Sequence, residues 1–212
     1  MDLQHLSKDY GIAITGGIAC GKSTIAKIVR DAGHLVIDAD QVARDVVAPK
    51  SEGLDLIRNQ FGEQFVVDGQ LNRMKLRELI ISDKDAKKRL ESITHPLIHK
   101  RSFEVLKKEG FEQSPRIWFY EAALIFEAGR GDQFNRIWVA HCPEDIQISR
   151  LCKRDEVSIE LARKTIAAQM PVADKVAKAD LAIDTNCTLE ELSFRIKASL
   201  QKLEMEFSDE KR

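Results

Sequence analysis

The stretch GGIACGKST, residues 16–24, follows the apolar run YGIAIT and precedes a segment with helical spacing. The pattern G-x-x-x-x-G-K-[S/T] is met by Gly16, Gly21, Lys22 and Ser23. Glycines at a strand-to-helix turn let backbone N–H groups come close to phosphate oxygens, and the N-terminus of the following helix favours an anion. The stretch therefore predicts a loop that binds the phosphates of a nucleotide.

We expect the whole loop to contact the nucleotide ATP. The predicted binding residues are Gly17, Ile18, Ala19, Cys20, Gly21, Lys22, Ser23 and Thr24. Lys22 would reach the β- and γ-phosphates and act in catalysis, and the hydroxyl of Ser23 would bind Mg²⁺. The alternative is a glycine-rich turn that binds no ligand.

The order of apolar runs predicts an α/β fold with a parallel sheet. We expect strands within five runs: 10–15, 34–40, 116–126, 136–141 and 179–184. A strand, a helix and a second strand in succession imply parallel pairing through a right-handed crossover. The expected nucleotide-binding core comprises residues 8–45, 113–142 and 179–207.

Two segments interrupt this core. Residues 46–112 show helical patterns without a strong β run, which predicts a helical insertion. Residues 143–178 are charged and helical in pattern, and we interpret them as a lid. Arg150 and Arg154 lie one helical turn apart there and would bring positive charge to a transferring phosphoryl group. The alternative is a pair of solvated amphipathic helices.

The C-terminal segment begins with a capping box, Thr188 with Glu191. One apolar stripe follows at helical spacing, formed by Leu189, Leu192, Ile196, Leu200, Leu203 and Phe207. We expect this helix to pack on the sheet, because the stripe is short for a coiled-coil seam. Upstream, we expect the residues before Tyr10 to form a disordered lead.

Composition excludes several classes of protein. The chain has 212 residues, 43% apolar and 32% charged, with a formal net charge of −1, as in an ordinary soluble globular protein without a basic excess for nucleic acid. We find no apolar run that could span a bilayer and no signal peptide, so no membrane partner is expected. The four cysteines form no C-x-x-C pair, which favours free thiols and a cytoplasmic location.

Two acids, Asp38 and Asp40, end the second expected strand. Ligands bind at the carboxyl ends of strands in such sheets, so an acid there is placed to orient an acceptor hydroxyl and to take its proton. The alternative is that one of these acids, Asp40 for instance, only caps the helix that follows.

Other reactive side chains receive weaker assignments. His95 and His99 have helical spacing, but Pro96 suggests that His95 lies just before a helix, and no third metal ligand is near in sequence. Cys20 lies close to a helix start and to Lys22, which lowers a thiol pKa. We therefore expect Cys20 to be sensitive to oxidation or alkylation and to be protected by ATP, unless cysteine is there only because it is small.

The ordered set of motifs resembles the dephospho-coenzyme A kinase family over nearly the whole chain. The loop TGGIACGKST and the strand end VIDAD are followed by FGEQFVVDGQLNRMKLRELI, HP at 95–96, LIFE at 124–127, R-x-x-x-R-D from Arg150, AAQ at 167–169 and K…ADLAIDTN from Lys175. The resemblance implies a P-loop kinase core with a five-stranded parallel sheet flanked by helices, a helical substrate domain and a lid. It also implies ATP-dependent phosphorylation of the ribose 3′-hydroxyl of dephospho-coenzyme A.

By the same resemblance, Asp40 is the candidate base, Arg150 acts on the phosphates, and Arg73 and His95 bind substrate. One block departs from the family, which usually has an aspartate and a proline before LLFE; here the stretch is YEAALIFE. Glu121 would hold Mg²⁺ through water in place of that aspartate.

Three rival functions differ in what they require. Another small-molecule or nucleotide kinase would use the same core with a different acceptor. A non-catalytic ATP sensor would bind ATP without acceptor-stimulated ADP release. A GTP switch is not favoured, because the chain lacks N-K-x-D and D-x-x-G.

Overall fold

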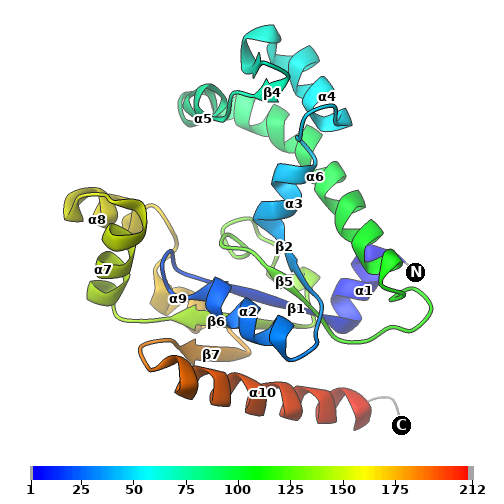
Figure 1. Ribbon diagram of the computed structural model, residues 1–212, viewed down its shortest axis with the longest axis vertical. Helices are drawn as coiled ribbons and strands as arrows, with labels where there is room; N and C mark the ends of the chain where they lie inside the picture. The colour runs from blue at the N-terminus through cyan, green and yellow to red at the C-terminus, as the bar shows by residue number, and fades with distance from the viewer. Residues whose placement is uncertain (1, 210–212) are drawn as a thin grey trace. The chain divides into compact units, whose positions relative to one another are not determined.

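The computed structural model describes residues 2–209 and contains a five-stranded parallel sheet in the order β2-β5-β1-β6-β7 (Figure 1). Its strands are β1 (Gly11–Gly16), β2 (Val36–Asp38), β5 (Trp118–Glu121), β6 (Arg136–His141) and β7 (Leu181–Asp184). The predicted α/β fold is confirmed. The central strand, β1, delivers the glycine-rich stretch to the carboxyl edge of the sheet, where ligand sites occur in this architecture.

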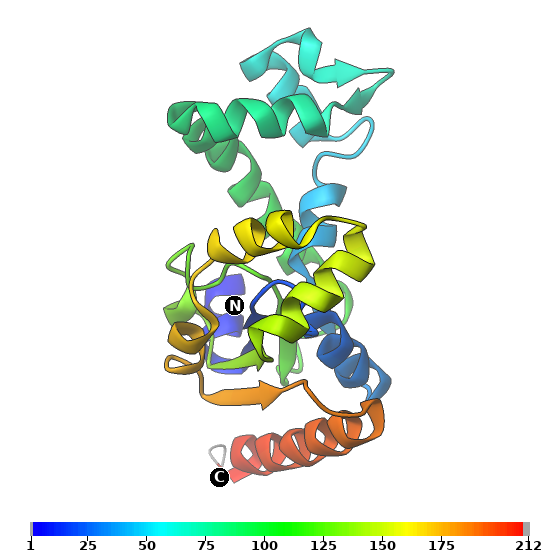
Figure 2. The same ribbon diagram turned by 90° about the vertical axis from the view of Figure 1, so that its left-hand side faces the viewer.

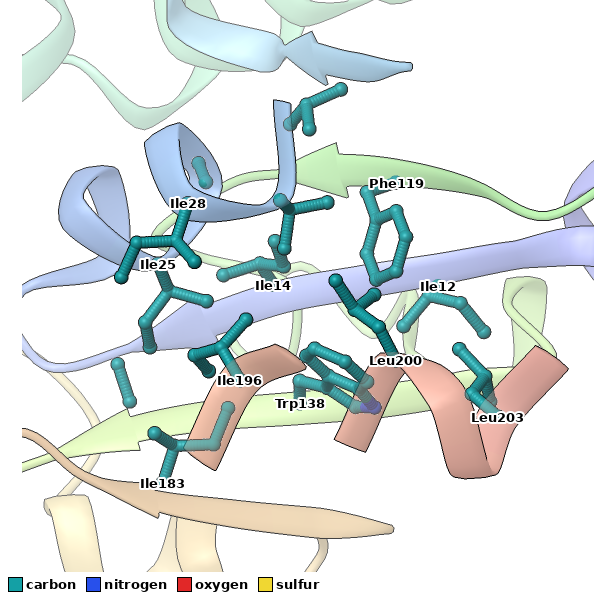
Figure 3. Close-up of a cluster of buried hydrophobic side chains, with 14 of the residues drawn as sticks. Ile12, Ile14, Ile25, Ile28, Phe119, Trp138, Ile183, Ile196, Leu200 and Leu203 are labelled. Atoms are coloured by element: carbon teal, nitrogen blue, oxygen red, sulfur yellow. The ribbon is translucent and has the colours of Figure 1, made fainter. Parts of the chain in front are cut away.

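The central strand β1 is buried along its whole length because both of its faces are covered. Ile12 and Ile14 of β1 point into a cluster that also contains side chains of α2 (Lys22–Asp31) and α10 (Leu189–Asp209). Figure 3 shows this cluster between the strands and α10, with Trp138 and Leu200 among its members. The burial of these side chains fixes β1, and hence the start of the glycine-rich loop, in the middle of the unit.

The predicted packing of the C-terminal helix is confirmed, with one exception. The capping box forms, since Thr188 Oγ1 accepts from Glu191 N at 3.2 Å and Glu191 Oε2 accepts from Thr188 N at 2.9 Å. The buried members of the stripe are Leu192, Ile196, Leu200, Leu203 and Phe207. Leu189 is 65% exposed, because it is the first residue of α10 and precedes the turn that reaches the core.

The expectation of a disordered lead before Tyr10 is wrong. Residues Leu3–Tyr10 form the helix α1, capped by Asp2. Leu6 is fully buried, and its carbonyl accepts a hydrogen bond of 3.2 Å from Trp118 Nε1. Such an anchor can only be seen once the chain is folded, because Trp118 is far from α1 in sequence.

The segment predicted to be a lid contains three helices. They are α7 (Glu144–Asp155), α8 (Ile159–Ala167) and the short α9 (Val172–Val176). Both views place α7 and α8 beside the carboxyl ends of β1 and β6 (Figures 1 and 2). A 3₁₀ turn, η2 (Gly131–Gln133), precedes β6 on the way to this segment.

The chain divides into two compact units, and the elements above belong to the unit formed by residues up to Ile37 and from Pro115 onward. The second unit, Asp38–Ser114, contains α3 (Ala39–Asp45), α4 (Glu52–Phe61), η1 (Glu63–Phe65), β3 (Val66–Val67), β4 (Gln70–Leu71), α5 (Arg73–Ser82) and α6 (Lys84–Lys108). Its helices pack on α6 around apolar side chains such as Leu54 and Leu76. This unit begins eight residues before the insertion expected at 46–112 because Asp38 already caps α3.

The second unit contains a small β-hairpin that the sequence analysis missed. Strands β3 and β4 are antiparallel, and Asp68 and Gly69 between them have φ values of 49° and 71°. An Asp-Gly pair is a strong signal for a two-residue hairpin turn. The signal was therefore present in the sequence, but the strands are only two residues long.

The placement of His95 ahead of a helix is also wrong. A single helix, α6, runs through Pro96 and contains both His95 and His99. Proline removes one backbone donor inside a helix. The carbonyl that loses its N–H partner is that of Ser92, one turn before Pro96. Ser92 and Pro96 are both exposed, so this carbonyl lies on the solvent side and the helix continues.

Within residues 2–209, none of the helices combines the length and the apolar character that crossing a bilayer requires.

Candidate nucleotide-binding site

The glycine-rich loop is shaped by residues with left-handed backbone. Ala19 and Gly21 have φ values of 59° and 78°, and Gly21 is the N-cap of α2. Alternation of left-handed and right-handed residues turns successive N–H groups toward one side and forms an anion-binding concavity. The first turn of α2 adds N–H groups that have no acceptor within the helix.

Two glycines of the loop are required by close neighbours. A Cβ on Gly16 would collide with the carbonyl oxygen of Ala140 on β6. A Cβ on Gly17 would lie 2.5 Å from Nε2 of Gln147. A side chain at position 16 would push against the backbone of β6, whereas one at position 17 would displace the amide of Gln147.

The predicted ligand-binding side chains lie at the junction of the loop and α2. Lys22 Nζ donates to the carbonyl oxygens of Gly17 at 2.9 Å and Gly16 at 3.2 Å, so its cation lies over the loop. Ser23 is exposed in the first turn of α2. Backbone donors, one lysine and one hydroxyl together suit the phosphates of ATP and a Mg²⁺ ion, because phosphate oxygens need donors and Mg²⁺ prefers oxygen ligands.

Arg150 reaches the loop through one intermediate residue. Its guanidinium donates to Thr185 Oγ1 at 3.0 Å and to Thr185 O at 2.8 Å. The Thr185 hydroxyl in turn donates to the carbonyl of Cys20 at 3.1 Å. The structure thus brings Arg150 of α7 close to the loop, and its action on the phosphates stays a prediction.

Glu121 ends β5 and is largely buried, with 13% of its side chain exposed. One oxygen lies 3.7 Å from Arg30 Nη2 of α2. In the sheet Glu121 is paired with Ile14 of β1, two residues before the loop begins. The register places the backbone of Glu121 beside β1, two residues before the loop, and Arg30 offsets part of the carboxylate charge. Its role with Mg²⁺ stays a prediction.

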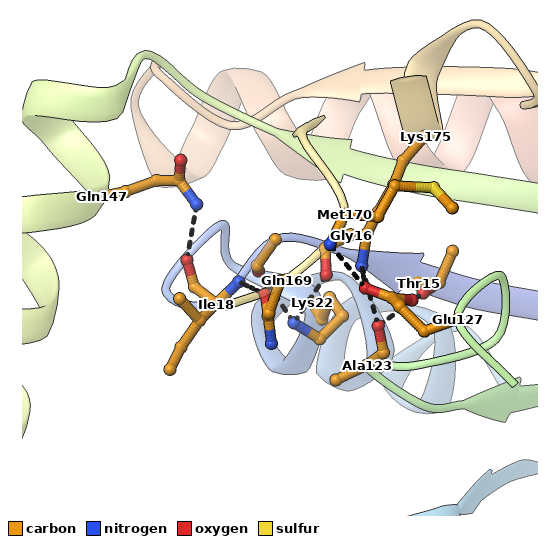
Figure 4. A network of polar contacts seen from close by, with 11 residues as sticks. Thr15, Gly16, Ile18, Lys22, Ala123, Glu127, Gln147, Gln169, Met170 and Lys175 are labelled. Carbon is orange, nitrogen blue, oxygen red and sulfur yellow. Dashed lines mark hydrogen bonds and ion pairs between the residues drawn. The ribbon is translucent and has the colours of Figure 1, made fainter. Parts of the chain in front are cut away.

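An ion pair between a fully buried lysine and a glutamate lies beside the end of β1, and neither residue was predicted from the sequence to have a role. Lys175 Nζ lies 2.7 Å from Glu127 Oε1 and donates to Ala123 O at 3.1 Å (Figure 4). Thr15 Oγ1 donates to the same carbonyl at 3.2 Å. Glu127 and Lys175 belong to the LIFE and K…ADLAIDTN blocks, but only the fold brings the two blocks together.

Two glutamines of the lid segment bind one loop residue, a contact that the sequence analysis also missed. Gln147 Nε2 donates to Ile18 O at 2.8 Å, and Ile18 N donates to Gln169 Oε1 at 2.8 Å. Figure 4 shows the two side chains approaching Ile18 from different elements. The AAQ block contained Gln169, but its spacing gave no indication of the partner.

Cys20 differs from the reactive, accessible thiol expected from the sequence. Its side chain is fully buried, and its sulfur accepts a hydrogen bond of 3.7 Å from Cys142. The hydrogen bond from Cys142 and, to a smaller extent, the charge of Lys22 lower the pKa of Cys20. The contact with Cys20 and burial raise the pKa of Cys142. Cys142, which the sequence did not indicate, is thus the main cause of the lowered pKa of Cys20; Lys22 contributes less, and burial restricts access by reagents.

The remaining predicted residues lie in the second unit. Asp38 caps α3, accepting from Asp40 N at 2.9 Å and from Gln41 N at 3.1 Å. Asp40 is exposed in the first turn of α3, so the capping role falls to Asp38. Arg73 begins α5 and His95 lies within α6, and both are exposed.

Comparison with known proteins decides the family. Residues 10–191 match the family model described as Dephospho-CoA kinase. The chain belongs to the dephospho-CoA kinase family. A relative from Geobacter sulfurreducens named Dephospho-CoA kinase is 41% identical over 186 residues, which cover 87% of this chain and 94% of the relative. A second relative named Dephospho-CoA kinase, from Hydrogenovibrio crunogenus, is 37% identical over 193 residues, which cover 91% of this chain and 96% of the relative.

A solved structure agrees with this assignment. The dephospho-CoA kinase from Campylobacter jejuni aligns with a TM-score of 0.66 and 26% identity, covering 92% of this chain and 97% of that one. The dephospho-CoA kinase match begins at Tyr10 and ends at Glu191, so nearly all of α1 and of α10 lies outside it. The loop, the sheet and the lid segment lie inside it, and the resemblance stated from the motifs is confirmed.

Proposed function

We propose that this chain transfers the γ-phosphoryl group of ATP to the ribose 3′-hydroxyl of dephospho-CoA, giving CoA and ADP. The observation that carries the proposal is the loop 16–24, an anion-binding concavity at the start of α2, in a chain of the dephospho-CoA kinase family. In the transfer, the bond from the γ-phosphorus to the β–γ bridging oxygen breaks and a bond to the 3′-oxygen forms. The rival kinases and the ATP sensor have no such family support.

The residues of the loop would bind and orient the phosphates. Lys22 would move from the carbonyls of Gly16 and Gly17 to the β- and γ-phosphates, since a phosphate is the stronger acceptor for an ammonium group. Mg²⁺, when bound, would neutralise charge that develops on the phosphates. Ser23 would hold the ion directly, and Glu121 would hold it through water.

Residues of the second unit would handle the acceptor. Asp40 would orient the 3′-hydroxyl and take its proton, and Arg73 and His95 would bind the remainder of dephospho-CoA. Because Asp38 caps α3, the carboxylate of Asp40 is not needed for the cap. Residues 46–112 would accordingly form the substrate domain.

Arg150 would act on the transferring phosphoryl group from the lid, 143–178. Its present partner, Thr185, touches the loop through the Cys20 carbonyl, so a small change of rotamer would redirect the guanidinium. Closure of the lid would also exclude water, which competes with the acceptor. A cytoplasmic location is part of the proposal and rests on the free cysteines, since a reducing compartment keeps thiols free.

The test is ADP release with and without dephospho-CoA, combined with mass analysis of the product. We expect acceptor-dependent ADP release and a product heavier by one phosphoryl group. ADP release without transfer would contradict the proposal, as would equal activity with an unrelated alcohol. Lys22→Ala should abolish turnover, and the matched control Lys27→Ala should not, because Lys27 is exposed on α2 and pairs with Asp31 of the same helix at 2.6 Å.

A further inference from the structure

One residue of the phosphate loop is bound at both of its backbone polar groups by lid side chains. The N–H of Ile18 donates to Gln169 Oε1, and the carbonyl of Ile18 accepts from Gln147 Nε2, each at 2.8 Å. Figure 4 shows both contacts. We call this arrangement of Gln147, Ile18 and Gln169 the glutamine clamp.

The backbone fixes the orientation of each glutamine amide. An N–H group can only donate, so Gln169 must present its oxygen; a carbonyl can only accept, so Gln147 must present its NH₂ group. The two positions therefore differ in the chemistry that they tolerate. A carboxylate preserves the bond at position 169 and destroys it at position 147, where oxygen would face oxygen.

Both glutamines are held from behind. Gln147 is 2% exposed, and its Nε2 fills the space that the missing Cβ of Gly17 leaves. Next to Gln169, Met170 N donates at 3.1 Å to Glu127 Oε1, which is bound by buried Lys175. A clamp anchored at both ends can hold the direction of the loop peptides.

We propose that Gln147 and Gln169 are positioning residues that fix the phosphate loop by binding Ile18, so that the lid segment determines how the loop receives a polyphosphate. The kinetic part of this proposal depends on the proposed kinase function. The structural part does not, because the contacts on Ile18 can be measured without nucleotide. Nothing in the loop motif itself requires glutamine at either position.

The decisive comparison is between Gln169→Glu and Gln169→Lys. If the clamp acts through the acceptor on residue 169, the Glu variant keeps hydrogen-exchange protection of the Ile18 amide in the nucleotide-free protein, and the Lys variant loses it. The KM for ATP should stay within about threefold for Gln169→Glu and rise about fivefold to tenfold for Gln169→Lys, the upper range for the loss of one hydrogen bond at a partly buried group. Simple attraction of phosphate to charge predicts the opposite order.

Position 147 gives an independent test. Gln147→Leu keeps the size of the side chain and leaves the Ile18 carbonyl without its donor, and Gln147→Glu sets two oxygens against each other. Both should raise the KM for ATP and the dissociation constant of ADP, measured by calorimetry, with a smaller effect on kcat. A thermal unfolding scan identifies any variant that fails to fold, and then the position 169 pair alone decides.

Gln201 on α10 is the matched control, because it is an exposed glutamine that lines no part of the loop. Gln201→Glu and Gln201→Lys should leave Ile18 protection and the KM unchanged. The proposal is overturned if Gln169→Lys binds ADP more tightly than Gln169→Glu, or if Ile18 protection is the same in all variants. If the exchange results hold but no transfer to dephospho-CoA is found, the clamp stands and the proposed function fails.

Discussion

Lys175 Nζ lies 2.7 Å from Glu127 Oε1, and no part of the lysine side chain is exposed to solvent. Because the same Glu127 oxygen accepts from Met170 N, this pair ties α9 and the end of the lid segment to the chain after β5. The Ala123 carbonyl completes the set by accepting from Lys175 and from Thr15, which belongs to β1. The pair therefore joins the elements that surround the phosphate loop.

Lys175→Met should destabilise the protein by about 1–3 kcal/mol. It leaves the Glu127 carboxylate and the Ala123 carbonyl without the ammonium donor, and an unsatisfied partner costs about 1–3 kcal/mol. Water reaches the Glu127 side chain, which is 23% exposed, and offsets part of the loss. Urea unfolding measures the loss. Replacing both Lys175 and Glu127 by Met should lower the free energy of unfolding less than Lys175→Met alone does. A larger loss in the double variant would contradict the pairing. Lys164→Ala, which breaks the exposed pair with Glu160, should cost below about 1 kcal/mol.

Glu127 should make the protein sensitive to acid. Burial raises the pKa of Glu127, but the hydrogen bonds from Lys175 and Met170 outweigh burial, and the pKa is below the ordinary value of 4.5. The folded protein thus binds fewer protons at this carboxyl than the unfolded chain. Its contribution to stability is complete above pH 4.5 and declines as the pH falls through the folded pKa.

Glu127→Gln removes this titration, so its stability should fall less steeply below pH 4.5 than that of the unaltered protein. Unfolding free energies measured across this range provide the comparison. Parallel curves for the two proteins would show that Glu127 is not responsible.

Asp38→Asn and Asp40→Asn should separate a capping role from a catalytic one. If Asp40 is the base, Asp40→Asn lowers kcat at least about 100-fold, within the range for general base catalysis, and leaves nucleotide affinity and stability nearly unchanged. Asp38→Asn keeps a good N-cap and should cost little stability, whereas Asp38→Ala should cost about 0.5–2 kcal/mol. Steady-state kinetics and thermal unfolding of the three variants are the measurements. Near-normal kcat in Asp40→Asn would remove Asp40 from the mechanism.

Arg150→Ala should reduce kcat by about 10³-fold or more while ATP binding changes little, because the proposed contact forms with the transferring phosphoryl group. Arg195→Ala is the matched control, because Arg195 is an exposed arginine of α10 and lies outside the lid segment. Single-turnover rates and calorimetry of ATP binding separate the two effects. A loss of affinity with normal kcat would mean that Arg150 binds the ground state instead.

Cys20 should react with iodoacetamide more slowly than Cys152, although its pKa is lowered. Cys20 is fully buried against Cys142, whereas Cys152 on α7 is partly exposed. Mass spectrometry of peptides after timed labelling gives the order of reaction. If ATP slows the labelling of Cys20 further, the loop must open for the reagent to enter; the same rate with and without ATP would end the idea of protection by nucleotide.

The amino-acid sequence alone determined the features that depend on neighbouring residues. The loop 16–24, the alternation of strands and helices and the capping box at Thr188 all follow from contacts within a few residues, and all appear in the structure. The ordered motifs were sufficient for the family. The Asp68–Gly69 turn also carried a local signal, which was overlooked only because its strands are short.

The tertiary structure decided the contacts that join distant segments. The carbonyl of Leu6 in α1 accepts a hydrogen bond from Trp118, and the clamp joins Ile18 to residues more than a hundred positions away. Lys175 of the lid segment pairs with Glu127, which lies in the chain after β5. Spacing cannot reveal such pairs, because each partner looks like an ordinary polar or apolar residue in its own segment. Only burial makes them specific: once water is removed, a carboxylate, an ammonium group or a peptide carbonyl must find its partner in the fold.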